Sequence, residues 1–168
     1  MVLSLLDIRN YFCILNRFLY GEKRNLSGEN INGIMYAAKK YMVPQLVRHC
    51  ILFLIQKIAP ATVCATLQLA NELDEKSLKN SCLSFIKSIS FDSLRQADLN
   101  VVDQQTLLQI ISLHELDCEE IDVYEACVAW AKSNCEQNHK KPSVTNIRKA
   151  LGPVLEEIRF PLMSSSDF

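Results

Sequence analysis

The sequence predicts an all-α protein built from helical hairpins, and three observations support this prediction. Apolar residues recur with the i, i+3, i+4, i+7 spacing of a helix face along nearly the whole chain, whereas the alternation typical of strands is rare. The composition has only 4 glycines and 5 prolines and is 49% apolar, which suits helices joined by short loops. Because short connections separate the periodic segments, consecutive helices should pack side by side and antiparallel.

The first well-marked helix pair lies between Ser27 and Ile58. Ser27 is the predicted N-cap of a helix that ends at Lys40, and Glu29 lies in its first turn. Proline is favoured at the first position of a helix and disfavours helical geometry in the preceding residue, so "MVP" at 42–44 predicts a corner. The predicted apolar stripes are Ile31, Ile34, Met35 and Ala38 in the first helix, and Leu46, Val47, Cys50, Ile51, Leu54 and Ile58 in the second.

The second pair runs from Pro60 to Ile89. Pro60 is predicted to open a helix, and Asp74 is predicted to cap the next one. The inward residues are predicted to be Val63, Leu67 and Ala70 in the first helix, and Leu78, Cys82, Phe85 and Ile89 in the second.

The C-terminal half is predicted to contain short turns between residues 91 and 103 and then three helices. "QQTLLQIISL" forms the first, and "CEEIDVYEACVAWAKSNCE" the second and longest. After the solvated loop "QNHKKPSV", the last helix runs from Val144 to Glu157 and is terminated by Pro161. The long helix should bury Ile121, Tyr124, Val128 and Ala131 with Trp130 at the flank, and the last should bury Ile147, Leu151, Val154, Leu155 and Ile158.

The charge and the absence of long apolar runs exclude several classes of partner. The chain carries 18 basic and 19 acidic residues, so it has no surplus of positive charge for nucleic acid or an anionic membrane surface. No apolar run reaches the roughly 18 residues of a membrane span. The apolar start "MVLSLLDIRNYFCILNRFL" is interrupted by Asp7 and Arg9, and we interpret it as a helix of the fold rather than a signal peptide.

The cysteines and histidines do not form a recognisable catalytic or metal-binding pattern. The 7 cysteines are an odd number with no CxxC pair, which favours reduced core residues and a reducing compartment, namely the cytoplasm or alternatively the nucleus. We interpret the following groups as structural rather than chemical: His49 with Cys50; Cys127, Cys135 and His139; and His114 with Glu115 and Asp117. We therefore expect a binding module without catalytic residues, cofactor or metal.

Residues 12–54, "FCILNRFLYGEKRNLSGENINGIMYAAKKYMVPQLVRHCILFL", resemble the C-terminal helices of a BTB/POZ domain. The segments "APATVCATLQLANELDEKSLKNSCLSFI", "SLHELDCEEIDVYEACVAWA" and "IRKALGPVLEEIRFPLM" resemble the BACK domain that follows BTB in many proteins. The insertion "CEQNHKKPSVTNIRKALG" is most similar to the subgroup in which a PHR domain follows. The resemblance implies that residues 1–58 are the C-terminal helical part of a BTB/POZ domain and that residues 59–168 are a BACK domain.

The resemblance further implies a substrate adaptor of a cullin-3 RING E3 ubiquitin ligase, with an unknown substrate. In the family, the first BACK helix pair extends the cullin-binding groove of the BTB domain. Family members homodimerise through the N-terminal half of the BTB domain. We expect that half, and the PHR domain, to be missing here, so dimerisation and strong cullin binding are not expected. The cullin-contact residues that the resemblance implies are Tyr20, Tyr41, Met42, Thr62, Ala65, Thr66 and Leu69.

Two other functions remain open on the sequence. One is a BTB–BACK scaffold that organises transcription or the cytoskeleton without a role in a ligase. The other is a cysteine-dependent enzyme, which the sequence disfavours because no base is placed beside any cysteine.

Overall fold

The computed structural model describes residues 26–90, 94, 98–113 and 119–163, and these residues form helices, turns and loops with no strand. The all-α prediction is therefore confirmed. The chain divides into two units, one ending at Lys57 and the other beginning at Ile58. The segment before residue 26, which includes the predicted N-terminal helix, lies outside the described residues.

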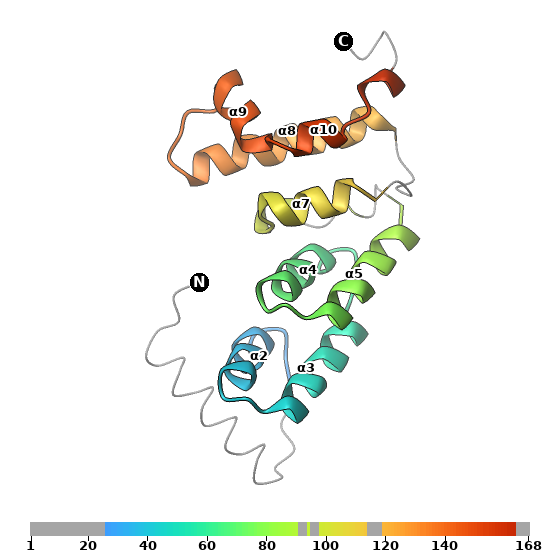
Figure 1. Ribbon diagram of the computed structural model, residues 1–168, viewed down its shortest axis with the longest axis vertical. Helices are drawn as coiled ribbons and strands as arrows, with labels where there is room; N and C mark the ends of the chain where they lie inside the picture. The colour runs from blue at the N-terminus through green and yellow to red at the C-terminus, as the bar shows by residue number, and fades with distance from the viewer. Residues whose placement is uncertain (1–25, 91–93, 95–97, 114–118, 164–168) are drawn as a thin grey trace. The chain divides into compact units, whose positions relative to one another are not determined.

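In the first unit, α2 (Ile31–Lys40) and α3 (Pro44–Gln56) pack against each other as a hairpin (Figure 1). Pro44 occupies the start of α3, as predicted. The predicted stripe of α2 is buried, and in α3 the buried residues are Leu46, Cys50 and Leu54, whereas Val47 and Ile51 are only partly covered. The apolar periodicity therefore identified the faces that the two helices share.

The start of α2 differs from the prediction. The N-cap is Asn30 rather than Ser27, and Glu29 precedes the helix. The Asn30 side chain accepts a hydrogen bond from the Ser27 backbone N–H at 3.0 Å, which closes a turn before the helix begins. The serine thus contributes its backbone to a turn and does not cap the helix.

The corner between α2 and α3 is a Schellman motif, in which the residue after the C-cap adopts a left-handed conformation. Met42 has φ 54°, and the Val43 N–H donates to the Ala38 carbonyl at 2.8 Å. Glycine is the usual residue at such a position because it has no Cβ. The "MVP" corner therefore depends on an unusual methionine conformation as well as on Pro44.

The second unit begins with the hairpin of α4 (Val63–Glu72) and α5 (Lys76–Ser88), which pack closely (Figure 1). Residues 60–62 form a turn, so α4 starts three residues after Pro60 rather than at it. Val63, Leu67 and Ala70 are buried, as predicted. In α5 the buried residues are Leu78, Cys82 and Ile86, while the predicted Phe85 and Ile89 are partly covered.

The predicted role of Asp74 as the cap of α5 is wrong. Glu75 is the N-cap residue, and Asp74 has φ 51° in a second Schellman motif that ends α4. The Glu75 N–H donates to the Ala70 carbonyl at 2.8 Å in that motif. The turn places Asp74 before the cap position, which is why its side chain does not serve the first turn of α5.

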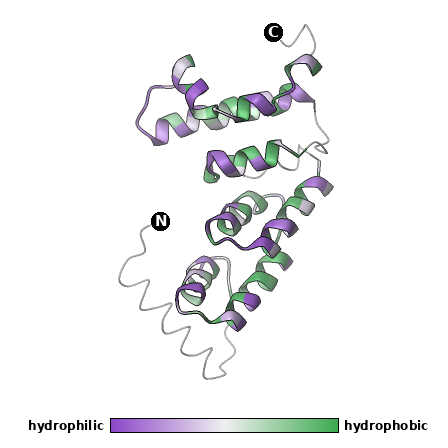
Figure 2. Cartoon of the chain, in the orientation of Figure 1, coloured by the Kyte–Doolittle hydropathy of each residue, from purple (hydrophilic) through white to green (hydrophobic). Residues whose placement is uncertain are grey.

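The remaining elements of the second unit follow α5 in chain order (Figure 1). They are η1 (Leu99–Val101), α7 (Gln104–Ile111), α8 (Glu120–Gln137), α9 (Val144–Leu151), α10 (Val154–Glu157) and η2 (Phe160–Leu162). Helix α7 contacts both α4 and α10, and α8 contacts α9 and η1. The hydropathy colouring shows apolar sides on these helices and a hydrophilic loop between α8 and α9 (Figure 2).

Helix α8 buries a face that shares only Ala131 with the predicted one, and Trp130, predicted at the flank, lies within the buried face. Its buried apolar residues are Val123, Cys127, Trp130, Ala131 and Cys135, whereas Ile121, Tyr124 and Val128 are only partly covered. Both sets follow helical spacing, so the helix has two apolar sides. Contact with the other helices of the unit, rather than periodicity, decides which side is buried.

The single final helix of the prediction is two helices in the structure. Gly152 separates α9 from α10 with φ 48° and ψ −121°, a conformation that residues with a side chain rarely adopt. A Cβ on Gly152 would lie 2.8 Å from Nε2 of Gln104. The glycine therefore allows both the break and the close approach of α7.

Candidate protein-interaction surface

The start of α4 presents an outward face made of Thr62, Ala65 and Leu69. These residues follow the i, i+3, i+7 spacing of one helix side, opposite the buried Val63 and Leu67. Thr62 and Ala65 are exposed, and Leu69 is partly exposed. The hydroxyl oxygen of Thr62 accepts a hydrogen bond from the Ala59 N–H at 3.1 Å, which holds the turn that leads into the helix. The predicted contact residues of α4 therefore include three that a partner protein can reach.

Thr66, the fourth predicted contact residue of α4, is placed differently. It is 8% exposed, and its hydroxyl donates to the Thr62 carbonyl at 2.9 Å. This hydrogen bond lies within the helix and uses the polar part of the side chain. In this structure Thr66 supports α4 from within, and its contact with a partner remains a prediction.

The corner between α2 and α3 carries two more of the predicted contact residues. Tyr41 is 43% exposed and Met42 is 86% exposed. The Lys40 ammonium lies 6.0 Å from the centre of the Tyr41 ring, at the outer limit of a cation–π contact. An apolar side chain exposed to this extent, on a backbone that favours glycine, contributes little to folding. Tyr20, the remaining predicted residue, lies outside the described residues.

A polar network that the sequence analysis did not predict joins α4 to α7. Gln68 accepts at Oε1 from the Asp103 N–H at 3.0 Å and from the Thr106 hydroxyl at 2.8 Å. The Asn71 amide donates to Thr106 Oγ1 at 2.9 Å and to Gln109 Oε1 at 3.2 Å. Thr106 is fully buried, so the network satisfies polar groups inside the unit. These bonds fix the inward side of α4 and thereby orient its outward face.

Asp103 both caps α7 and belongs to this network. Its Oδ1 accepts from the Thr106 N–H at 2.7 Å. Burial by itself raises the pKa of this carboxyl, but the hydrogen bonds from Thr106 and Gln68 outweigh it and lower the pKa below the ordinary value. Asp103 is therefore ionised at neutral pH. An aspartate just before an apolar helical run is a capping signal that the sequence contained, whereas its pairing with Gln68 depends on tertiary contact.

A second unpredicted interaction ties the end of the described chain to α8. The Glu120 side chain is 4% exposed, and its Oε2 lies 2.9 Å from Nη2 of Arg159. Arg159 also donates from its backbone N–H to Oε1 at 2.8 Å and from Nε to Oε2 at 3.0 Å. The carboxylate is fully occupied by structural bonds. The Glu120 carboxylate therefore holds the segment after α10 against α8 and is not available as a catalytic acid or base.

The described cysteines are reduced and buried, as predicted: Cys50, Cys64, Cys82, Cys127 and Cys135. Burial raises the pKa of the thiols of Cys50, Cys64, Cys82 and Cys127 to about 12, which suppresses the thiolate form needed by a nucleophile or a metal ligand. The His49 ring lies outside the core, with Nδ1 2.8 Å from the Gln45 carbonyl oxygen. These sites have no features of cysteine catalysis.

The described ranges contain neither a metal-binding cluster nor a membrane-spanning helix. There, no group of three His, Cys, Asp or Glu side chains gathers closely enough to hold a metal ion. Each helix in those ranges is too short or too polar to cross a bilayer. The acidic residues Glu115 and Asp117, and His114, lie outside the described residues.

Comparison with known protein families gives two matches that together cover most of the chain. Residues 63–168 match the BACK family, described as "BTB And C-terminal Kelch", and residues 8–58 match the BTB/POZ domain. These matches agree with the resemblance seen in the sequence. Ala65 and Leu69 of the outward face lie at the beginning of the BACK match, and Thr62 directly precedes it.

Individual curated relatives extend over nearly the whole chain. BTB/POZ domain-containing protein 3 from Homo sapiens is 32% identical over 157 residues, which cover 94% of this chain and 30% of the relative. BTB/POZ domain-containing protein 6 from Homo sapiens is 30% identical over 157 residues and is covered to 29%. The corresponding protein 6-A from Danio rerio is 29% identical over the same length. The chain thus spans about 30% of the length of the curated relatives it matches.

Proposed function

This chain belongs to the family of proteins that combine a BTB/POZ domain with a BACK domain, and from that membership we propose that it is a non-enzymatic adaptor of a cullin-3 RING E3 ubiquitin ligase. The domains of this family mediate contacts between proteins. The buried, high-pKa cysteines and the fully bonded Glu120 carboxylate support a role in binding rather than in catalysis. Five buried reduced cysteines also support a reducing compartment such as the cytoplasm or nucleus.

The observation that carries the proposal is the outward face of α4. Thr62, Ala65 and Leu69 offer a small, weakly polar surface on a helix whose opposite side is fixed by apolar packing and by the Gln68 network. A rigid helix side loses little conformational entropy when a partner covers it. We propose that this face contacts the cullin and that Tyr41 and Met42 provide further contacts from the first unit.

A pull-down with the N-terminal region of cullin-3 tests the function. We expect this chain to retain the cullin region weakly, and a version that carries a complete BTB domain to retain it strongly, because the second version offers a larger contact surface. A BTB-containing relative without cullin binding serves as the background control. Failure of the version with a complete BTB domain to bind would overturn the adaptor function and leave a scaffold function without ligase activity.

A further inference from the structure

A cavity of about 300 Å³ lies at the end of the second unit that carries α9. It is formed between the start of α7, the last turns of α8, the loop that follows and α9. None of these elements contributes to the outward face of α4. The residues that line the cavity are Gln104, Trp130, Asn134, Cys135, Lys140, Asn146, Lys149 and Ala150.

The floor of this cavity is built from fixed groups. The Trp130 indole N–H donates to the Val102 carbonyl at 3.1 Å, and the residue is 3% exposed. Gln104 donates from Nε2 to the Ala150 carbonyl at 2.7 Å and to the Leu151 carbonyl at 3.2 Å, which holds the end of α9 against α7. The cavity is therefore preformed and does not depend on a loop that must close.

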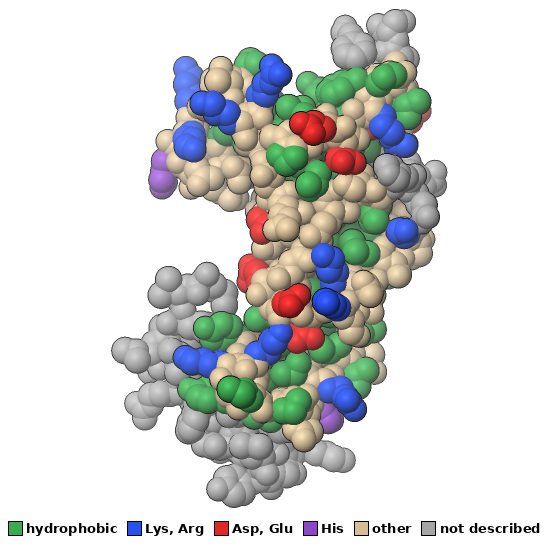
Figure 3. All heavy atoms as spheres, in the orientation of Figure 1, with side chains coloured by type: hydrophobic (Ala, Val, Ile, Leu, Met, Phe, Trp, Pro, Cys, Tyr) green, Lys and Arg blue, Asp and Glu red, His purple; other side chains and the backbone are tan. Residues whose placement is uncertain are grey.

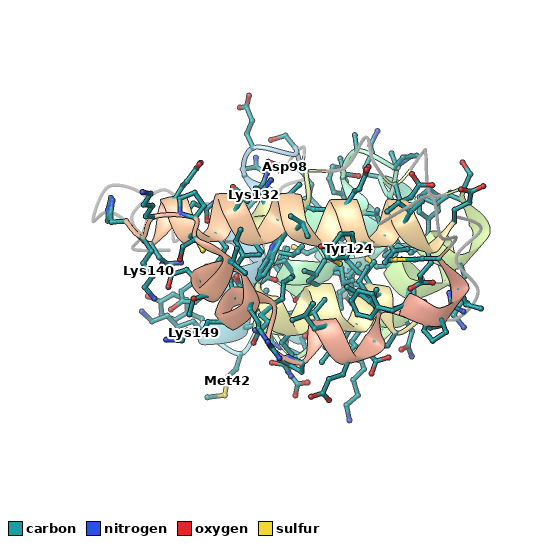
Figure 4. The ribbon with its side chains drawn as sticks, turned by 90° about the horizontal axis from the view of Figure 1, so that it is seen from above. Met42, Asp98, Tyr124, Lys132, Lys140 and Lys149 are labelled. Atoms are coloured by element: carbon teal, nitrogen blue, oxygen red, sulfur yellow. The ribbon has the colours of Figure 1, made fainter. Side chains whose placement is uncertain are left out.

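The rim of the cavity is positively charged. Lys140 and Lys149 line it and lie at the same end of α8 (Figure 4). Neither ammonium forms an ion pair or hydrogen bond with another residue in the part of the chain that the structure describes. The sequence has no Asp or Glu between Glu136 and Glu156, although it has four Lys or Arg there. In the space-filling view, Lys and Arg side chains gather over α9 with no acidic side chain among them (Figure 3).

We propose that this cavity binds a glutamate-rich acidic segment of a partner protein. The ammonium groups of Lys140 and Lys149 would pair with carboxylates, and the partly exposed Ala150 beside them suits the methylene groups of a glutamate side chain. Asn134 accepts at Oδ1 from Asn138 at 3.3 Å, which leaves its amide nitrogen able to donate to a carboxylate. Nucleic acid is the less favourable occupant, because the chain as a whole carries net charge −1 and has no surplus of positive charge to follow a long polyanion beyond this cavity.

Fluorescence anisotropy with a labelled hexaglutamate peptide tests the proposal on the full 168-residue chain. Lys140→Gln and Lys149→Gln should each weaken binding roughly two- to fivefold, and the double variant about tenfold, as expected for partly exposed ion pairs. Binding should also weaken as salt is raised, because the charges are screened. Both lysines are exposed, so circular dichroism should show unchanged helix content in the variants.

Lys76→Gln is the matched control, since it removes one exposed lysine from α5, which does not line the cavity. It should leave hexaglutamate binding unchanged, and a hexaglutamine peptide should not bind. The proposal is overturned if hexaglutamate does not bind, or if the double variant binds it as well as the unchanged chain does. It is also overturned if Lys76→Gln weakens binding as much as the cavity variants, or if a single-stranded oligonucleotide of equal charge binds more tightly at the same lysines.

Discussion

Replacing Trp130 with alanine is expected to lower the free energy of unfolding of the unit that begins at Ile58 by about 3–5 kcal/mol. The side chain is 3% exposed, so its removal leaves a large cavity between α8 and its neighbours. It also leaves the Val102 carbonyl without the indole N–H that it accepts at 3.1 Å. Urea denaturation followed by circular dichroism measures the loss, since the variant has no tryptophan fluorescence.

Trp130→Phe separates the two contributions to this loss. Phenylalanine keeps most of the ring volume but cannot donate to the Val102 carbonyl, so we expect a smaller loss of about 1–3 kcal/mol. A loss below about 1 kcal/mol for Trp130→Ala would show that the tryptophan does not anchor α8 as described. The same result would also contradict the description of Trp130 as a fixed group in the cavity proposed to bind an acidic segment.

The Glu120→Ala substitution is expected to lower the free energy of unfolding by about 2–3 kcal/mol. Breaking a buried ion pair costs about 3–5 kcal/mol, but the Arg159 side chain is 45% exposed and regains contact with water, which reduces the effect. The substitution also leaves the Arg159 backbone N–H without its acceptor at 2.8 Å. The segment after α10 should therefore become more accessible, which limited proteolysis of the folded variant detects.

Glu119→Ala is the matched control for this experiment. Glu119 is exposed, precedes Glu120 and makes no side-chain capping bond, so its removal should change stability by less than about 0.5 kcal/mol. Equal losses for the two variants would mean that general acidity near the start of α8 matters and that the specific bonds to Arg159 do not.

The hairpins were predictable because their helices carry one apolar stripe each. Ile34, Leu67 and Leu78 are buried where the spacing placed them. In α8, by contrast, Ile121 and Val123 lie on different apolar sides, and only the neighbouring helices determine which side is buried. The Gly152 break was missed because the dipeptide "GP" stands inside an otherwise helical pattern.

The residues of the candidate surface were predicted from family resemblance. The hydrogen bonds that hold α4 and α8 in place were not predicted. Ala65 and Leu69 follow from the position of the family's first BACK helix pair. The bonds of Gln68 with Asp103 and Thr106 join residues 35 or more positions apart, and no local pattern reports such pairs. The same reason explains why the Glu120 bonds to Arg159, 39 positions away, were not predicted.

The most direct test of the central claim compares two exposed alanines. Ala65 lies on the outward face of α4 and Ala129 lies on α8, and glutamate at either position remains in solvent in the unbound chain. In a version that carries a complete BTB domain, Ala65→Glu should weaken cullin-3 binding at least about tenfold, whereas Ala129→Glu should change it by less than about twofold. Biolayer interferometry measures both dissociation constants. Unaltered binding by the Ala65→Glu variant would contradict the claim that α4 contacts the cullin.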